Sequence, residues 1–471
     1  MTWPDSHDAR NDGPVREIAL NATPPTGDPI DHAAALGTRP VGRLLWHACT
    51  QTTLSVGVYG IYALTNAWFV ARGVGPDAMA AVNLVAPVLL LLGAVSTSVG
   101  VGGASLVSRH LGAGDPASAA RSAGNAFAVF WATAVLITVS GTLAIGPLLT
   151  VLGADGSTRS DARDYAVIIF AGALVSTGFS SLVRAEGRMR FSTMLWVVPV
   201  LVQITLDPLL IFGFDLGVRG AALGTVGGQA VSATMSVWFF FRQRRRPYYI
   251  SKAELRYHGP TVRALCKVGA PSCLAGLGAT LLAALVNNSL AHVGGVVALA
   301  AYAVCARIQT FVMMPQLGIS QGLQPIVGYN AGRRRHDRVR RAEALSLRAT
   351  LLYGISVAGA AVLLAEDLVG IFIEDGSAAT TARHALRIMA LGIAVAGVAP
   401  LVSAFFQALG HVTPSYVISV GTLVAVKAPL VIALSHVGPN GVWAGLAIGE
   451  LASALIALVV LRLLRPRAAM T

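Results

Sequence analysis

Apolar runs of roughly 20 residues recur along the chain from about residue 44 to residue 464, separated by short loops rich in Gly, Pro, Asp and Arg. A helix of that length crosses the hydrocarbon core of a bilayer. The runs lack the alternation of apolar and polar residues that marks a membrane β-strand. The pattern therefore predicts an all-α integral membrane protein with about twelve transmembrane helices.

The predicted spans fall into two sets of six on either side of a basic linker at 242–267. This predicts an N-lobe at 44–241 and a C-lobe at 268–464. Residues 1–43 are polar and rich in Asp, Pro and Gly, which predicts a disordered cytoplasmic tail, and 465–471 form a second cytoplasmic tail. The expected spans lie at about 44–70, 78–107, 122–151, 165–183, 191–212, 221–241, 268–291, 298–328, 345–372, 385–409, 415–434 and 441–464.

The second lobe repeats the first, most clearly where 284–342 aligns with 63–122 after one gap. Because each lobe holds an even number of spans, both copies enter the membrane from the same side. We therefore expect two lobes related by an axis along the membrane normal, with a transport cavity between them. The aligned pairs include Asn66 with Asn287, Val107 with Val327, and Gly112 with Gly332.

Composition agrees with a membrane protein, since 55% of the residues are hydrophobic, only 12% are charged, and the mean hydropathy is +0.66. A formal net charge of +13 would also suit a nucleic-acid binder. The basic residues, however, concentrate in the loops after even-numbered spans, such as 242–267 and 333–341, whereas loops after odd-numbered spans hold most of the acids. This positive-inside pattern places the even-numbered loops and both termini in the cytoplasm, and we expect no nucleic-acid partner.

The chain shows no pattern typical of an enzyme, a metalloprotein or a primary pump. Its four cysteines, Cys49, Cys266, Cys273 and Cys305, lie in or beside spans without metal-ligand spacing, which predicts neither a disulfide framework nor a metal site. There is no HExxH and no P-loop. A channel or receptor would not explain two repeats of six spans, whereas a secondary transporter would.

One acidic residue, Asp207, lies well inside an apolar run, directly before Pro208. A charged side chain near the centre of a bilayer costs about 3 kcal/mol on insertion scales. Such a residue is by default a candidate for function, and it should face the interior of the helix bundle. The next span carries Thr225 and several glycines that permit close helix packing.

Six motifs in order resemble those of the MATE family, the multidrug and toxic-compound extrusion antiporters, over essentially the whole chain after residue 40. The stretch 318–332 (GISQGLQPIVGYNAG) is closest to the MepA-like branch of that family. The other matching stretches are 78–87 (AMAAVNLVAP), 111–115 (LGAGD), 206–213 (LDPLLIFG), 220–225 (GAALGT) and 441–444 (GVWA).

The resemblance implies two six-helix bundles around a central cleft that opens alternately to either side. It also implies multidrug efflux, the export of bulky organic cations in exchange for protons or sodium. The coupling residues of relatives with a first-lobe site fall on Asn66, Gln203, Asp207 and Thr225 of this chain. Asn66 stands where the family usually has Asp, and Gln203 where it usually has Asn, so one of two carboxylates is missing.

A single carboxylate changes the expected chemistry of coupling. Two carboxylates in one site raise each other's proton affinity and offer two negative charges to a metal ion, and here only Asp207 remains. It can still bind one proton, with the Asn66 and Gln203 amides as hydrogen-bond partners. We therefore favour proton coupling, with sodium as the alternative ion. A third reading is that coupling has been lost or has moved.

Other intramembrane polar residues are secondary candidates. Glu450 and Lys427 would be the site of displaced coupling, or an ion pair that fixes helix packing. Arg307 would cap polar backbone or face water in the cleft, and the amides of Asn287 and Asn288, the repeat counterparts of Asn66 and Ala67, suggest a paired structural or cavity-lining role.

Met313, Met314 and Gln316 are candidates for an adaptable wall that binds aromatic cations, although core or lipid-facing packing is the preferred interpretation for any one of them. The rival function in the same fold superfamily is a flippase or exporter of a lipid-linked or other amphiphilic metabolite, which would need a cleft lined by arginines. We expect small organic molecules and the lipid bilayer as partners, no cofactor, a monomer, and a location in the plasma or inner membrane.

Overall fold

The computed structural model describes residues 32–468 except 75, 152–155, 176–178, 244–245 and 374–375. This part of the chain is helical and contains no β-strand, which confirms the predicted all-α class. Eight of its helical stretches are long and apolar enough to cross a membrane. Residues 1–31 and 469–471, which belong to the two predicted tails, lie outside the described residues.

After α1, the described residues form twelve helical segments in two lobes, as predicted. In the N-lobe the fourth segment combines α6 and α7, with the 3₁₀ turn Ala173–Val175 after α6, and α8 and α9 each continue into a π-helical turn, Leu209–Gly213 and Trp238–Arg242. The N-lobe helices are α2 (Val41–Gly73), α3 (Pro76–Gly112), α4 (Pro116–Leu143), α5 (Ile145–Val151), α6 (Gly156–Gly172), α7 (Ser180–Ala185), α8 (Met189–Pro208) and α9 (Gly217–Val237).

The C-lobe begins with α10, which turns back on itself at Gly295, whose φ of 60° and ψ of −155° are not helical. The two halves of α10 are the seventh and eighth segments. The remaining helices are α11 (His336–Leu363), α12 (Ala365–Gly370), α13 (Ser377–Ile393), α14 (Val398–Leu409), α15 (Val412–Tyr416), the π turns Val417–Gly421 and Leu423–Lys427, α16 (Ala428–Ser435) and α17 (Pro439–Ala468), after α10 (Gly259–Gly332).

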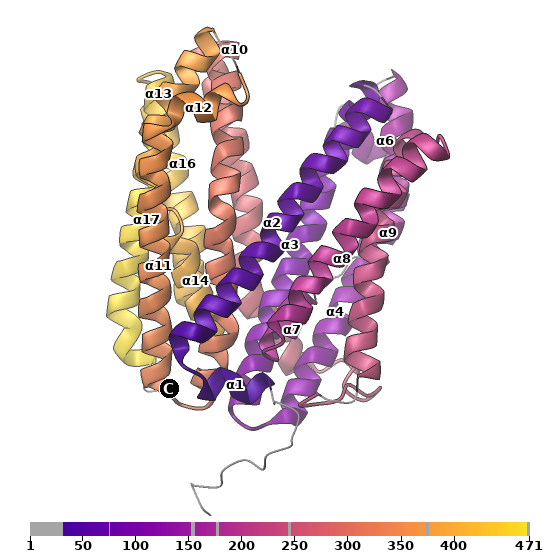
Figure 1. The fold of residues 1–471 in the computed structure, drawn as a ribbon, viewed down its shortest axis with the longest axis vertical. Helices are drawn as coiled ribbons and strands as arrows, with labels where there is room; N and C mark the ends of the chain where they lie inside the picture. Colours follow the sequence, from indigo (N-terminus) through magenta and orange to yellow (C-terminus); the bar gives the residue numbers. More distant parts are fainter. Residues whose placement is uncertain are drawn as a thin grey trace, which may run out of the picture.

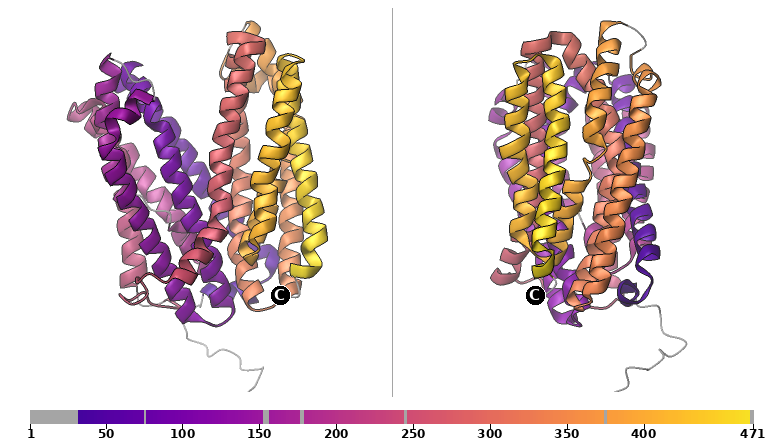
Figure 2. Two further views of the ribbon diagram at one scale, coloured as in Figure 1. Left: turned by 180° about the vertical axis from the view of Figure 1, so that it is seen from behind. Right: turned by 90° about the vertical axis from the view of Figure 1, so that its left-hand side faces the viewer.

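The two lobes converge at one end of the molecule and diverge at the other, giving the V shape seen in Figures 1 and 2. One hydrophobic core cluster at the converging end contains residues from both lobes, including Val107 and Leu323. Two further clusters are confined to one lobe each, around Leu290 in the C-lobe and Tyr165 in the N-lobe. Among the residues whose burial is described, the core cluster that contains residues of both lobes therefore joins them at the converging end.

The repeat seen in the sequence is present in the structure as a reciprocal contact between the lobes. A methyl group at Gly112 would lie 2.0 Å from the carbonyl oxygen of Tyr329, and one at Gly332 would lie 2.1 Å from that of Arg109. Residues 109 and 329 are themselves counterparts in the alignment. Each lobe thus presents a glycine to the same backbone position of the other, as a pseudo-two-fold axis requires.

The structure differs from the sequence prediction at the end of the N-terminal tail. Residues His32–Thr38 were expected to be disordered, but they form a helix, α1, with Ala33 and Leu36 buried. This segment is too short to be predicted as a membrane span, and it lies in a polar stretch of the sequence. It is ordered by packing against residues that are distant in the sequence. At the other end, α17 continues to Ala468, beyond the expected end of the last span.

Candidate functional site

The strongest candidate site lies between α8 and α9 in the N-lobe. Gln203 and Asp207 are one helical turn apart on α8, so they share the face that meets α9, and they are 5% and 1% exposed. Gly224 and Gly228, also one turn apart, face them from α9. A methyl group at Gly224 would lie 2.0 Å from Oδ1 of Asp207, so only glycine leaves room for the carboxylate.

Hydrogen bonds bring all four predicted coupling residues together. The Asn66 side-chain amide on α2 donates to Oδ2 of Asp207 over 3.2 Å. The Gln203 amide donates to the hydroxyl of Thr225 over 2.9 Å, and that hydroxyl donates to the carbonyl oxygen of Ala221 over 3.1 Å. The departures Asn66 and Gln203 therefore act as amide donors where the family usually has Asp and Asn.

The other carboxylate oxygen of Asp207 is unpartnered. Oδ1 is buried and has no hydrogen-bond partner among the described residues. A buried charge that is bound by one neutral donor is poorly compensated, because burial removes water from both of its oxygens. The site therefore offers one negative charge and one open acceptor atom to a proton or a cation.

Prolines shape the helix that carries this site. Pro199 has no backbone N–H, so the carbonyl oxygen of Leu195 loses its helical donor. The hydroxyl of Ser232 on α9 replaces it, donating to that oxygen over 3.0 Å. Asp207 lies directly before Pro208 and the π turn Leu209–Gly213, a kind of distortion that occurs frequently at functional sites.

In the C-lobe, Lys427 and Glu450 form an ion pair of 2.6 Å between the π turn Leu423–Lys427 and α17. Their side chains are 18% and 20% exposed. The contact is an ion pair between neighbouring helical segments, as the sequence allowed, and a role of the pair in coupling stays a prediction.

The remaining secondary candidates do not join the Asp207 site. Asn287, Asn288 and Arg307 are all exposed, on the two halves of α10. Asn66 and its repeat counterpart Asn287 thus differ in environment, since only Asn66 contacts a buried acid. Among the described residues, no group of three or more His, Cys, Asp and Glu side chains is arranged to hold a metal ion.

The predicted substrate wall is only partly compatible with the structure. Met314 lies at the seam between lobes, where a methyl group at Gly60 of α2 would meet its Cε at 2.5 Å. Gln316, by contrast, is 1% exposed and lies against Gly354 and Gly397 inside the C-lobe, which is the core packing that the sequence left as the alternative. Gln316 lies two residues after Met314, and a separation of two residues in an α-helix places two side chains on roughly opposite faces.

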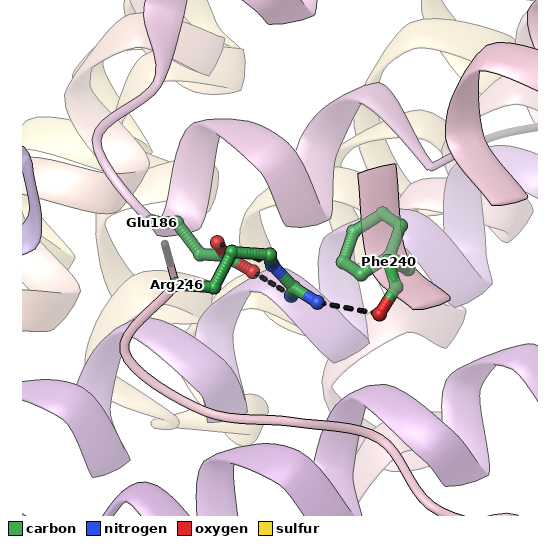
Figure 3. Close-up of polar contacts among 3 residues, drawn as sticks. All are labelled: Glu186, Phe240 and Arg246. Atoms are coloured by element: carbon green, nitrogen blue, oxygen red, sulfur yellow. Dashed lines mark hydrogen bonds and ion pairs between the residues drawn. The ribbon is translucent and has the colours of Figure 1, made fainter. Parts of the chain in front are cut away.

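Sequence reasoning missed a buried ion pair between Glu186 and Arg246. Figure 3 shows the guanidinium of Arg246, from the linker between lobes, donating to the Glu186 carboxylate and to the carbonyl oxygen of Phe240. The rings of Phe239, Phe240 and Tyr248 lie 4.9, 4.5 and 4.7 Å from its central carbon. Glu186, the only acid in an otherwise basic turn, was the available signal.

A family model described as MatE matches residues 53–209 and 271–432, more than half of the chain and one stretch in each lobe. The chain belongs to the MatE family. The resemblance drawn from the six sequence motifs is thereby confirmed. The match covers Asn66, Gln203 and Asp207, whereas Thr225 lies just beyond its first stretch.

Relatives of this MatE family member include the multidrug export protein MepA of Staphylococcus aureus (strain NCTC 8325 / PS 47), which is 26% identical over 438 residues, 91% of this chain and 95% of that protein. An FAD transporter of Shewanella oneidensis is 23% identical over 425 residues, 88% of this chain and 92% of that protein. Both alignments extend over nearly the full length of this chain.

Solved structures show the same fold. A MATE structure in the bent conformation has a TM-score of 0.89 at 22% identity and covers 94% of this chain and 100% of that one. The outward-facing conformation of a multidrug resistance MATE family transporter of the MOP superfamily has a TM-score of 0.88 at 23% identity and covers 93% of this chain and 99% of that one. This MatE family member is therefore a multi-pass membrane protein with the two-lobe layout of MATE transporters.

Proposed function

We propose that this protein is a multidrug exporter that works by secondary antiport, moving small organic, mostly cationic and amphiphilic compounds out of the cell in exchange for protons, with sodium as the alternative ion. We place it as a monomer in the plasma or inner membrane, with both termini in the cytoplasm. The observation that carries the proposal is a buried, incompletely paired carboxylate, Asp207, in the N-lobe of a MatE family member.

The composition of the site favours a proton over sodium. Asp207 supplies the single negative charge, and the groups around it are the amides of Asn66 and Gln203 and the hydroxyl of Thr225. A proton neutralises one carboxylate completely and needs no further ligands. A sodium ion would need several oxygen ligands, and the Thr225 hydroxyl already accepts a hydrogen bond from the Gln203 amide nitrogen and donates one to Ala221.

The link between ion binding and movement runs through Asn66. This residue belongs to α2, which near Thr52 and Thr53 packs against Gly318 of α10 in the C-lobe and farther along contacts Asp207 of α8. A proton on the Asp207 carboxylate weakens its acceptor strength and changes the bond from Asn66. We propose that α2 shifts in response and that this shift biases the two lobes between their open states.

The basic turn between α7 and α8 and the basic loop between α10 and α11 both contact α1, which lies on the side where the lobes converge (Figure 1). By the positive-inside pattern this side is the cytoplasm, so the structure corresponds to a state open to the outside. In that state Asp207 would exchange its ion with the external solution. The change to the state open to the cytoplasm would then separate the two lobes where they touch near Gly112 and Gly332.

The test is efflux of a fluorescent organic cation from proteoliposomes, driven in turn by a pH gradient and by a sodium gradient. Asp207→Asn should remove most of the pH-driven efflux while leaving membrane insertion intact. Asp215→Asn is the matched control, because it makes the same chemical change at an exposed position of the same lobe. Its backbone, with a φ of 51°, is one that asparagine tolerates.

Efflux that follows the pH gradient and is lost only in Asp207→Asn supports proton antiport through the N-lobe. Efflux that requires sodium would mean that sodium, and not the proton, is the coupling ion of the N-lobe site. Full efflux in Asp207→Asn would move the coupling site elsewhere, with Glu450 as the next residue to test.

A second candidate, export of an anionic amphiphile, is favoured by one observation. Arg184 is buried at the lobe interface, and within the described part of the chain it donates hydrogen bonds to neutral oxygens, those of Ser181, Ser192 and Gln321 among them. When the lobes separate on that side, its charge would face the opened cleft. Efflux of FAD, compared with that of the cationic dye in the same vesicles, distinguishes the two substrate classes.

A further inference from the structure

The stretch 318–332, which carries the strongest sequence resemblance, makes no contact with Asp207. Its glycines pack instead against the backbone of the other lobe: Gly318 against Thr53, Gly322 against Cys49, and Gly332 against Arg109. The side chains at its end, Tyr329 and Asn330, are buried without belonging to the candidate ion site. A role in joining parts of the molecule accounts for them.

Asn330 and the start of α11 hold the C-terminal end of α1. The Asn330 amide donates to the carbonyl oxygen of Leu36 over 3.0 Å, and Arg335 donates to that of Gly37 over 3.1 Å. Arg338 donates to the carbonyl oxygens of Leu36 and Arg39 over 3.2 and 2.6 Å. The carbonyls of Leu36 and Gly37 are among those that α1 leaves without internal donors at its C-terminal end, where positive charge is also favourable.

The residues that bind α1 also contact one another. Arg338 donates to the Asn330 side-chain oxygen over 2.9 Å, which orients the amide so that its nitrogen donates to Leu36 of α1 and to the carbonyl oxygen of Ile326 on α10. Gly37 allows close approach, because a methyl group there would meet Cε1 of Tyr329 at 2.8 Å. The apolar side chains of Ala33 and Leu36 are buried beneath the helix.

The other end of α1 meets the N-lobe. A methyl group at Gly187, in the turn between α7 and α8, would lie 2.2 Å from the carbonyl oxygen of His32. Gly187 has a φ of 78°, so this turn needs glycine for its backbone as well as for the contact. Figure 1 shows α1 lying across the converging ends of both lobes.

We propose that α1 is a latch that holds the two lobes together on their converging side, and that Asn330, Arg335 and Arg338 are the residues that seat it. Opening this side separates the Gly187 turn from the end of α10, and a seven-residue helix cannot follow both. One set of contacts must break, so α1 stabilises the closed side relative to the open one. The proposal assumes alternating access but no particular substrate or coupling ion.

The test measures the distance between the lobes on this side by pulsed electron spin resonance. Nitroxide labels are attached at two exposed positions, Arg190 at the start of α8 and Arg341 on α11, in full-length protein whose four cysteines are replaced by alanine. Asn330→Ala and Arg338→Gln remove contacts with α1. Arg340→Ala is the matched control, since it removes an exposed positive charge from the same helix.

The expected result is that Asn330→Ala and Arg338→Gln each raise the population with the longer distance by about tenfold, because bonds to charged or buried donors are lost from one state only. Gly37→Ala should act in the same direction from the side of α1, which guards against misfolding of a single variant. An unchanged distance distribution in folded Arg338→Gln and Gly37→Ala would overturn the proposal. An equal shift in Arg340→Ala would also overturn it, by assigning the effect to charge alone.

Discussion

Replacing Glu186 by alanine tests how the interlobe linker is anchored. The side chains of Glu186 and Arg246 are both 0% exposed, and the variant leaves the guanidinium in that site without its carboxylate. Arg246 would keep its hydrogen bond to the carbonyl oxygen of Phe240, at 2.8 Å, and its position among three aromatic rings. The change therefore isolates the loss of the counter-charge.

Removing one partner of a buried ion pair costs about 3–5 kcal/mol, because the other charge stays buried and uncompensated. The contacts that Arg246 retains place the expected cost near the lower end, about 3 kcal/mol. Each kcal/mol shifts the melting temperature of a domain of 150–250 residues, roughly the size of one lobe, by about 2–4 °C. We therefore expect Glu186→Ala to lower the apparent Tm by about 6–12 °C.

The assay is thermal unfolding of purified protein in detergent, followed by intrinsic fluorescence at a fixed scan rate. The matched control is Asp164→Ala, which breaks the exposed pair with Arg219 and should shift the apparent Tm by less than about 2 °C. Combining Glu186→Leu with Arg246→Met should restore most of the lost stability, since no unpaired charge remains. A Glu186→Ala shift no larger than the Asp164→Ala shift would refute the reasoning.

Three further outcomes are expected. Gly224→Ala should abolish pH-driven efflux, because its methyl group displaces the Asp207 carboxylate, whereas Gly227→Ala meets only the end of Leu206 and should keep most of it. Glu450→Gln should lower the apparent Tm by a few degrees, about 1–2 kcal/mol for a partly exposed pair, while dye efflux stays within about twofold of the unmodified protein. Burial, together with the Arg109 guanidinium, lowers the pKa of His411 in the turn after α14. Below about pH 6.5 the unfolded chain therefore binds more protons than the folded protein, and the apparent Tm should fall as the pH is lowered from 7.5 to 5.5. His411→Gln should make the apparent Tm less dependent on pH over this range.

Features set by local composition were predictable from the sequence. The spans follow from the length of apolar runs, and Asp207 stands out because a carboxylate within such a run is costly wherever it points. The repeat predicted the two-lobe layout, and the structure adds the reciprocal glycine contacts at its axis. The family motifs added Asn66, Gln203 and Thr225, which the fold brings to the same place.

Features set by distant partners were not predictable in this way. Gln316 has the polarity of a cleft residue, and only the packing of α10 against Gly397 turns it into the C-lobe. The sequence around Glu186 does not indicate that its partner is Arg246, which lies 60 residues away. The helix α1 is ordered by residues almost 300 positions farther along, Asn330 and Arg338.

The contacts of Gly112 with Tyr329 and of Gly332 with Arg109 are made by backbone atoms on both sides. These backbone contacts therefore do not depend on the side chains that line a substrate pocket farther along the helices. We expect substitutions that change the transported molecule to lie elsewhere along the helices and to leave the fit of this closed end unaltered. The same arrangement leaves that end intolerant of even one added methyl group, so selectivity and gating in this molecule are open to change at separate positions.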